Sequence, residues 1–261
     1  MDAKDYTHVK TSIKQVLKID LESYKAEQMI RRLDSWLIRS RIPTWKEYFS
    51  LISTDEKELE KFRNYLTINV TEFFRDPNRW DTLRKDVLPH LIKNSTGNRE
   101  LKLWSAGCSI GTEAYTMAIL MDEAFPTQKY SLLATDLDRG AMAKARSRGP
   151  YTPEDIRNLS PQQHKKYITL NAPFYTVENL QKNINFQEQD LFAATFDTGF
   201  DLIVCRNVVI YFTAESKELL YAKFSKALRP GGVLFVGGTE ILSGPAKHGF
   251  QNFGISFYKK G

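Results

Sequence analysis

The sequence has few of the features that mark secreted, membrane-spanning or metal-binding proteins. Only two of its 261 residues are cysteine, Cys108 and Cys205, which argues against a disulfide framework. The four histidines are scattered without metal-ligand spacing, so we expect no structural or catalytic metal. No apolar run approaches the roughly 20 residues that span a bilayer, and the polar N-terminus lacks a signal-peptide core. These absences favour a cytoplasmic protein without direct membrane insertion.

The charge balance is modestly basic. There are 37 Lys and Arg residues against 31 Asp and Glu residues, a formal net charge of +6. Such an excess suits a nucleic acid, a membrane surface or an acidic protein, and a solvated basic surface is the plain alternative. The length allows one large domain, or a medium domain with a small one.

Residues 1–68 have the pattern of an all-helical domain. Apolar residues recur at helical spacing in residues 9–17 and again in residues 26–37. Thr44 and Ser53 are each followed three residues later by glutamate, which predicts the caps of a third and a fourth helix. We therefore expect a basic, helical N-terminal domain over residues 1–68.

Residues 69–261 have the pattern of a second, α/β domain. Residues 69–98 are expected to form a linker and a leading helix. The apolar runs that predict strands are 101–105, 130–135, 200–205, 233–237 and 255–258, with helices at 112–125, 140–147 and 214–228. This alternation predicts a mostly parallel sheet with helices on both faces. The interval of about 165–187, including Ile184 and Phe186, breaks the alternation and is expected to be a small antiparallel β insert.

The segment LKLWSAGCSIGTEAY joins a buried strand to a helix through a glycine-containing turn. Glycine lets a backbone approach a ligand closely, and ligands of open α/β sheets bind beyond the carboxyl ends of the strands. We therefore expect Ala106, Gly107 and Glu113 to line a cofactor site. Ser109 replaces the second glycine of the dinucleotide fingerprint, and no phosphate-binding P-loop sequence is present.

The same turn, GCSIG, also matches the G-x-S-x-G nucleophile elbow of serine α/β-hydrolases. That alternative would use Ser109 as the nucleophile, with Asp201 and His248 as its partners. The pentapeptide is short, and no HGGG-type oxyanion segment accompanies it. The hydrolase is therefore the less favoured hypothesis.

Carboxylates follow the next two expected strands. Asp136 lies on the order of 20 residues past the glycine turn, where an acid accepts hydrogen bonds from ribose hydroxyls. Either Asp136 or Asp138 caps the following helix, and we expect Asp136 to be the ribose ligand. Asp190 and Leu191 are placed to accept from an adenine amino group and to pack against the ring.

A polar pair, Arg206 and Asn207, ends the fully apolar fourth strand, and LRPGG precedes the fifth. With the glycine turn and the acid after the second strand, these features resemble a class I, Rossmann-like S-adenosylmethionine methyltransferase. NVTEFFRD, AGCSIGTEAYT and CRNVVIYF together resemble the CheR family of chemotaxis receptor methyltransferases over nearly the whole chain. The resemblance implies S-adenosylmethionine as cofactor, S-adenosylhomocysteine as product, and methylation of glutamate carboxylates on the cytoplasmic helices of chemotaxis receptors.

The resemblance also implies which residues act. Those expected around the cofactor or the transfer site are Asn69, Thr71, Arg75, Glu113, Asp136, Asp190, Leu191, Arg206 and Asn207. Arg75 and Tyr211 are similar to the family residues at the reacting centre. A glutamate carboxylate is already ionised at neutral pH, so both would orient it and neither would move a proton. The alternatives are an ion pair of Arg75 with Glu72 or Asp76, and a core-packing role for Tyr211.

The expected second helix carries Lys25, Arg32 and Arg39, which are seven residues apart and share one face. We interpret them as a docking surface for an acidic receptor helix, with a solvated face as the alternative. Where residues 167–186 lie, some members of the family that this chain resembles carry a longer hairpin with a Gly-x-Gly turn, which is linked to gripping a tethering peptide at the receptor's C-terminus. The stretch in this chain is short and lacks glycine, so we predict no dependence on a pentapeptide tether. No aromatic-interleaved basic stretch indicates nucleic acid, although methylation of another substrate stays an alternative.

Calorimetry with S-adenosylhomocysteine separates these hypotheses. We expect saturable one-to-one binding to the wild type, loss of binding in Asp136→Ala, and only weaker binding in Ser109→Ala. A hydrolase would instead lose all activity on Ser109→Ala. Absence of binding at millimolar ligand would remove the methyltransferase interpretation and restore the hydrolase.

Overall fold

The computed structural model describes residues 1–67, 69–95 and 99–261. The domain boundary predicted at residue 68 and the end of the leading segment predicted at residue 98 lie outside the described residues. Backbone contacts divide the chain into two compact units, Met1–Ile68 with Tyr211–Glu218, and Asn69–Ile210 with Leu219–Gly261. Within the described ranges, no helix is long and apolar enough to cross a membrane.

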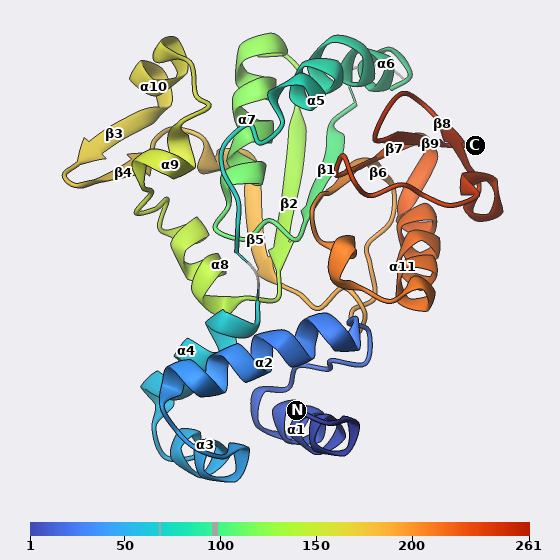
Figure 1. Ribbon diagram of the computed structural model, residues 1–261. Coiled ribbons are helices and arrows are strands. Elements are labelled where there is room, and N and C mark those ends of the chain that lie inside the picture. The colour runs from blue at the N-terminus through green and yellow to red at the C-terminus, as the bar shows by residue number, and fades with distance from the viewer. Residues whose placement is uncertain (68, 96–98) are drawn as a thin grey trace. The chain divides into compact units, whose positions relative to one another are not determined.

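Residues 1–67 of the first unit contain four helices, which confirms the predicted all-helical N-terminal region. They are α1 (Ala3–Leu17), α2 (Ala26–Ser40), α3 (Trp45–Ile52) and α4 (Glu56–Leu66) (Figure 1). Tyr48 of α3 and Phe62 of α4 are fully buried, and their rings meet edge to face with centroids 5.2 Å apart. Trp36 of α2 stacks on Phe62 at 5.5 Å, so three helices share one aromatic core.

One of the two predicted caps in this unit is confirmed and the other is wrong. Thr44 caps α3 by accepting a hydrogen bond from the backbone N–H of Glu47. Ser53 does not cap α4, because it still belongs to the last turn of α3 and donates its hydroxyl to the carbonyl of Ser50. The cap of α4 is Asp55, whose extended backbone aims its carboxylate at the helix N-terminus.

The second unit is built on a seven-stranded sheet of order β5-β2-β1-β6-β7-β9-β8. The strands are β1 (Leu101–Ala106), β2 (Tyr130–Asp136), β5 (Ile184–Glu188), β6 (Phe200–Cys205), β7 (Leu228–Val236), β8 (Phe250–Asn252) and β9 (Phe257–Lys260). The first five in spatial order are parallel, and β9 and β8 close one edge antiparallel. The predicted Rossmann-like α/β fold is confirmed.

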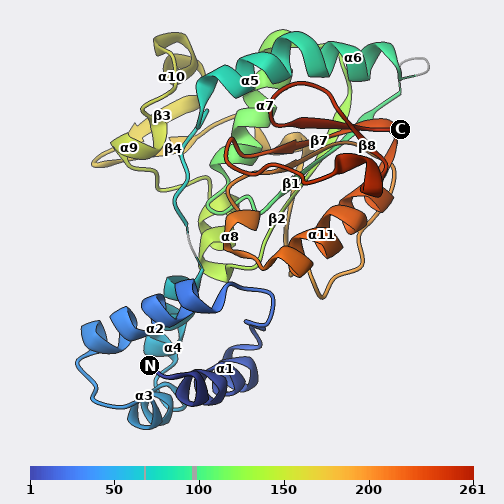
Figure 2. The same ribbon diagram turned by 45° about the vertical axis from the view of Figure 1, so that its right-hand side comes forward.

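Helices cover both faces of this sheet, as predicted. Besides the short helices of the β insert, the described helices of this unit are α5 (Pro77–Thr82), the π-helical turn Leu83–Val87, α6 (Leu88–Lys93), α7 (Thr112–Ala124), α8 (Arg139–Arg146) and α11 (Ala214–Ala227), which belongs here from Leu219 onward. Figure 2 shows α5 and α6 on one side of the sheet and α11 on the other. Side chains alternate accordingly: Leu103 of β1 joins the core beneath α7, while Trp104 contacts Phe224 of α11 at 5.5 Å.

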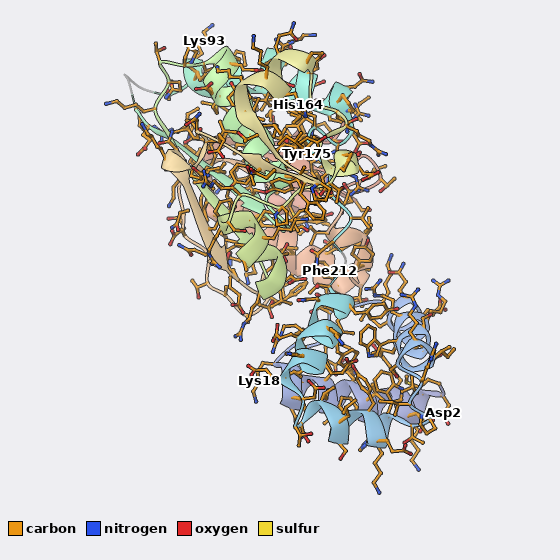
Figure 3. All side chains as sticks on the ribbon, turned by 90° about the vertical axis from the view of Figure 1, so that its left-hand side faces the viewer. Asp2, Lys18, Lys93, His164, Tyr175 and Phe212 are labelled. Atoms are coloured by element: carbon orange, nitrogen blue, oxygen red, sulfur yellow. The ribbon has the colours of Figure 1, made fainter. Side chains whose placement is uncertain are left out.

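The predicted β insert is confirmed, but part of its predicted content is wrong. Two antiparallel strands, β3 (Ile168–Asn171) and β4 (Phe174–Val177), follow the short helices α9 (Pro153–Ile156) and α10 (Pro161–Tyr167). Figure 3 shows His164 of α10 near Tyr175 of β4, and their ring centroids are 5.5 Å apart. Ile184 and Phe186 do not belong to this insert. They lie in β5, which extends the main sheet in parallel with β2, because Phe186 packs on Tyr115 of α7.

The carboxyl-terminal part of the sheet also differs from expectation. LRPGG is not a turn before the fifth strand, since β7 already begins at Leu228 and pairs with β6 across a register shift. Gly232 permits this pairing, because a side chain there would lie 2.9 Å from the carbonyl of Arg229 and 3.0 Å from that of Phe200. The short strand β8 has no clear sequence signal and was not predicted.

A buried carboxylate fixes the amino end of the sheet. Asp201, at the start of β6, is fully buried and accepts hydrogen bonds from the guanidinium groups of Arg99 and Arg229. It also accepts from the backbone N–H of Lys102 in β1 at 2.8 Å. The buried carboxylate therefore links two neighbouring strands and is paired with two partly exposed guanidinium groups.

We expect Asp201→Asn to lower the free energy of unfolding by about 3 kcal/mol, because it removes the fully buried charge that two partly buried guanidinium groups share. Urea denaturation measures this loss. The matched control is Asp197→Asn, since Asp197 is mostly exposed and only 3.6 Å from Lys102; its loss should stay below about 1 kcal/mol. Equal losses in the two variants would contradict the structural role of Asp201.

Candidate active site

The glycine turn after β1 brings backbone donors to the carboxyl edge of the sheet. Gly107 has a left-handed φ of +88°, and a Cβ there would lie 2.4 Å from Cγ2 of Val208. No other residue fits this position without displacing the neighbouring loop. The turn continues to Ser109, whose backbone N–H donates to Oδ2 of Asp136 at 2.8 Å.

The two acids that end β2 have different tasks. Asp138 caps α8 by accepting from the backbone N–H of Ala141 at 2.9 Å, so the capping alternative applies to Asp138. Asp136 points at the glycine turn and accepts one backbone hydrogen bond on each oxygen, from Ser109 and Asp138. Burial raises the pKa of Asp136 to about 6, and the backbone donors oppose that rise.

Residues 69–76 cross the start of α7 at this edge. The amide of Asn69 accepts from the hydroxyl of Ser109 at 2.7 Å and donates to the carboxylate of Asp138. The hydroxyl of Thr71 lies 2.6 Å from that of Thr112. These contacts place Asn69 and Thr71, both predicted from the sequence, beside Asp136 and the glycine turn.

Two oppositely charged residues are buried next to this segment. Glu113, in the first turn of α7, accepts a hydrogen bond from Ser105 at 2.7 Å, and burial raises its pKa to about 7 although Arg206 opposes the rise. The side chain of Arg206 is 2% exposed and donates to Asp76 at 2.7 Å. Its guanidinium lies 5.3 Å from the ring of Trp80 and 4.9 Å from that of Phe235, and burial lowers its pKa.

Glu240 is a buried carboxylate that the sequence analysis missed. It accepts from the backbone N–H groups of Asn207 and Gly237, each at 2.7 Å, and from that of Ile210 at 3.3 Å. These bonds hold Asn207 at a left-handed φ of +60° and join the loop after β6 to the loop after β7. The available signal was an acid shortly after the Gly237-Gly238 pair that ends the fifth strand.

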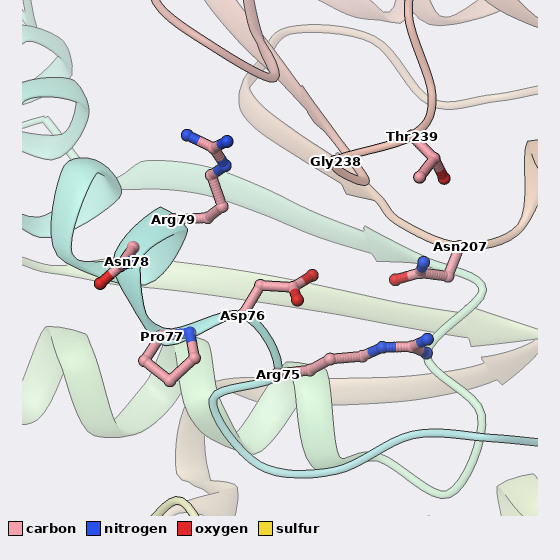
Figure 4. Close-up of a pocket in the computed structure, with 8 residues that line it drawn as sticks. All are labelled: Arg75, Asp76, Pro77, Asn78, Arg79, Asn207, Gly238 and Thr239. Carbon is pink, nitrogen blue, oxygen red and sulfur yellow. The ribbon is translucent and has the colours of Figure 1, made fainter.

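A cavity of about 590 Å³ opens where these loops meet residues 75–79. Its lining residues are Arg75, Asp76, Pro77, Asn78, Arg79, Asn207, Gly238 and Thr239. Figure 4 shows the side chains of Arg75 and Asp76 directed toward Asn207. One nitrogen of the Arg75 guanidinium donates to the carbonyl of Val70 at 2.6 Å.

The alternative ion pair for Arg75 is wrong. Glu72 pairs with Arg157 at 2.5 Å, and Asp76 pairs with Arg206 at 2.7 Å. The two acids nearest to Arg75 in sequence are therefore committed to other cations, and Arg75 faces the cavity.

Asp190 and Leu191 follow β5, the neighbour of β2. The carboxylate of Asp190 accepts from the backbone N–H of Phe192 at 2.7 Å, which shapes the turn after the strand. Lys223 of α11 donates to the carbonyl of Leu191 at 2.6 Å and fixes the same turn. The backbone N–H of Gln189 donates to the carbonyl of Asp136, so the ends of β5 and β2 lie together.

The remaining predicted residues belong to the other unit. Tyr211 ends the 3-10 turn Val209–Tyr211, is half-buried, and its carbonyl accepts from the backbone N–H of Lys25 at 2.9 Å. Lys25 and Arg39 are exposed. Arg32 is half-buried instead: its guanidinium donates to the carbonyl of Tyr65 and lies 4.8 Å from that ring. Only part of the predicted basic face therefore extends into solvent.

The residues nominated for a hydrolase do not assemble. Ser109 lies past the carboxyl end of β1, whereas Asp201 lies at the amino end of β6 and is held by Arg99 and Arg229. Because β1 and β6 are parallel, these positions are at opposite edges of the sheet. In the part of the chain that the structure describes, no group of three His, Cys, Asp or Glu side chains could hold a metal ion.

The raised pKa of Glu113 has a consequence for stability. Its folded-state pKa of about 7 lies above the ordinary 4.5, so the folded protein binds this proton more tightly. The stabilising contribution is complete below pH 4.5 and is lost as the pH rises through 7. We expect the stability of Glu113→Gln relative to wild type to rise by about 3 kcal/mol between pH 4.5 and pH 8. Urea denaturation at the two pH values tests this, and a difference that does not change with pH would contradict it.

Comparisons with known proteins agree with this geometry. Residues 69–258 match the family model described as CheR methyltransferase, SAM binding domain, and residues 4–67 match CheR methyltransferase, all-alpha domain. A chemotaxis protein methyltransferase of Listeria monocytogenes is 41% identical over 258 residues, covering 98% of this chain and 97% of the relative. Chemotaxis protein methyltransferase 1 of Pseudomonas aeruginosa is 32% identical, covering 94% of this chain and 92% of the relative. The chain therefore belongs to the CheR methyltransferase family and is a methyltransferase that uses S-adenosylmethionine.

Proposed function

We propose that this protein transfers the methyl group of S-adenosylmethionine to glutamate side chains of chemotaxis receptors and forms methyl esters. The relatives at 41% and 32% identity are named as chemotaxis protein methyltransferases, which supports the receptor as the substrate. The main support for a carboxylate as the methyl acceptor is the positive charge of the cavity beside Arg75.

The cavity suits an acceptor that is already anionic. Arg75 and Arg79 both line it, while Asp76, the one acid among its described lining residues, is paired with the buried Arg206. A glutamate carboxylate with an ordinary pKa of about 4.3 is ionised at neutral pH and needs no base. A hydroxyl or ammonium acceptor must first lose a proton, and an acid held by a guanidinium is a poor base for that step.

The residues at the sheet edge fit the cofactor chemically. S-adenosylmethionine has hydroxyl and amino groups that match the carboxylates of Asp136, Glu113 and Asp190, and a carboxylate that matches a guanidinium. Nε of Arg206 is one of several buried side-chain atoms that have no hydrogen-bond partner among the described residues, so this guanidinium has a donor left for an anionic ligand. The backbone of Ala106 and Gly107, with Asn69, Thr71, Leu191 and Asn207, completes the proposed binding site.

When bound, the cofactor supplies a methyl carbon on a positively charged sulfonium, and the electrons of the broken C–S bond stay with sulfur. The protein's part is to hold a carboxylate oxygen in line with that carbon and to exclude water. The remaining donors of the Arg75 guanidinium suit this task, because one nitrogen is already fixed on Val70. The role expected for Tyr211, a hydrogen bond that orients the attacking oxygen, stays a prediction.

The exposed cations Lys25 and Arg39 support a docking role for one face of α2 toward an acidic receptor helix. Arg32 contributes by holding α2 to Tyr65. The connection between β3 and β4 is only Ala172-Pro173, and we retain the prediction that no pentapeptide tether is needed. The proposal places the reaction in the cytoplasm and involves no nucleic acid.

The product's chemistry tests the proposal directly. The enzyme is incubated with S-adenosyl-[methyl-³H]methionine and a cytoplasmic fragment of a receptor. The labelled fragment should release volatile methanol in mild alkali, because methyl esters hydrolyse under these conditions. Methylated amines, amides and nucleic-acid bases keep their label under the same conditions. Replacement of the fragment's methylatable glutamates by alanine should remove the label, and alkali-stable label would overturn the choice of carboxylate.

Arg75→Lys should lower kcat/KM for the receptor fragment by at least about tenfold, because an ammonium cannot reproduce the fixed fork of a guanidinium. Label transfer at subsaturating fragment measures the change, and calorimetry with S-adenosylhomocysteine reports how much of it comes from cofactor binding. Wild-type activity in Arg75→Lys would contradict a positioning role for Arg75.

A further inference from the structure

A second arginine, which the sequence analysis did not select, lines the cavity beside Arg75. Arg79 lies in α5, four residues after Arg75 in the sequence, and is half-buried. Within residues 1–67, 69–95 and 99–261, its guanidinium has no hydrogen bond or ion pair, although its backbone N–H donates to the carbonyl of Asp76. The guanidinium therefore has donors that an anionic ligand in the cavity can accept from.

The charges around the cavity do not balance with one glutamate. Arg75 and Arg79 line the cavity, and the acid among its described lining residues, Asp76, is already paired with Arg206. Two guanidinium groups are therefore left without a counter-charge in the described lining. A single acceptor carboxylate compensates only one of them, so the arrangement favours a second anionic group in the same space.

The size of the cavity agrees with this count. A volume of about 590 Å³ is that of a pocket for a whole small ligand, so it has room for more of the substrate than one carboxylate, beside the part of the cofactor that Asn207 would contact. Figure 4 shows Arg79 and Arg75 extending to different sides of the cavity, with Asp76 between them. Two carboxylates carried on one segment can thus each meet a guanidinium without sharing it.

We propose, on the basis of the proposed function, that Arg79 is a specificity-determining residue that binds a second acidic side chain of the receptor. On a helical substrate, side chains three or four residues apart lie side by side. The second acid therefore lies within one helical turn of the methylated glutamate. Arg75 orients the reacting carboxylate, and Arg79 selects substrates in which that carboxylate has an acidic neighbour.

The experiment uses two receptor fragments that differ in one position. Each keeps one methylatable glutamate. A second position within one helical turn of it holds glutamate in the first fragment and the uncharged glutamine in the second. Wild-type enzyme should methylate the first fragment with kcat/KM about tenfold higher, the size expected for one partly solvated charge-assisted hydrogen bond. Arg79→Gln should lower kcat/KM for the first fragment about tenfold and leave the second nearly unchanged.

Arg84→Gln is the matched control. Arg84 lies on the next turn of the same helical segment, is 44% exposed and pairs with Asp81 at 3.1 Å, outside this cavity. It removes the same charge and should keep the tenfold preference between the fragments. Equal preference in wild type and Arg79→Gln, or equal loss on both fragments, would overturn the proposal.

The second carboxylate has one other source, the α-carboxylate of the cofactor itself. Calorimetry with S-adenosylhomocysteine distinguishes the two, because Arg79→Gln should keep the wild-type affinity within about twofold if the partner is on the substrate. A tenfold loss of affinity would assign Arg79 to the cofactor and overturn the proposal. Failure of wild type to methylate either fragment would instead remove the proposed function, and this inference with it.

Discussion

The arrangement of the site depends on a buried guanidinium. Arg206 directly follows β6, and its guanidinium lies against the rings of Trp80 and Phe235. The guanidinium donates to the carboxylate of Asp76 at 2.7 Å. Removing one partner from such a pair leaves an uncompensated charge in a medium that solvates it poorly. Asp76 is the residue at which residues 69–76 turn, with a left-handed φ of +58°, into α5. One ion pair therefore fixes both the direction of that segment and the start of the helix that carries Arg79.

The carboxylates of the site are held at a cost to the apoprotein. Burial raises the pKa of Glu113, of Asp136 and of Glu240, so each is less readily ionised in the folded chain than in water. For Asp136 and Glu240, hydrogen bonds from backbone N–H groups oppose this rise in pKa. For Glu113, the charge of Arg206 and the hydrogen bond from Ser105 oppose it. Groups with strongly perturbed pKa values that gather at one sheet edge are typical of a binding site and seldom of a stabilising core.

Two kinds of charged contact serve different ends of the same sheet. At the amino end, Asp201 accepts hydrogen bonds from Arg99, Arg229 and the backbone N–H of Lys102, and these contacts stabilise the fold. At the carboxyl end, Arg75 and Arg79 line a cavity, and among the described residues the guanidinium of Arg79 has no hydrogen bond or ion pair. The carboxyl end therefore offers donors to a ligand, which agrees with the rule that parallel sheets bind at the carboxyl ends of their strands.

The sequence by itself determined the α/β fold, the helical N-terminal region and the positions of most candidate residues. Asp136, Glu113 and Arg206 each lie next to the end of an apolar run, and the ends of parallel strands must converge at one edge. Ile184 and Phe186 were misplaced, because a short apolar run has the same pattern in a hairpin as in a parallel edge strand. Only packing on Tyr115 decided between them.

Tertiary structure alone decided which charges have partners. Local spacing suggested Glu72 or Asp76 for Arg75, yet these acids pair with Arg157 and Arg206, which are distant in sequence. The exposure of Arg32 and the bonds of Glu240 were equally hidden, since both depend on contacts between segments far apart in the chain. Periodicity specifies which face of an element is buried. It does not specify which charged group meets which, because an ion pair depends on the relative placement of two elements that only the folded chain fixes.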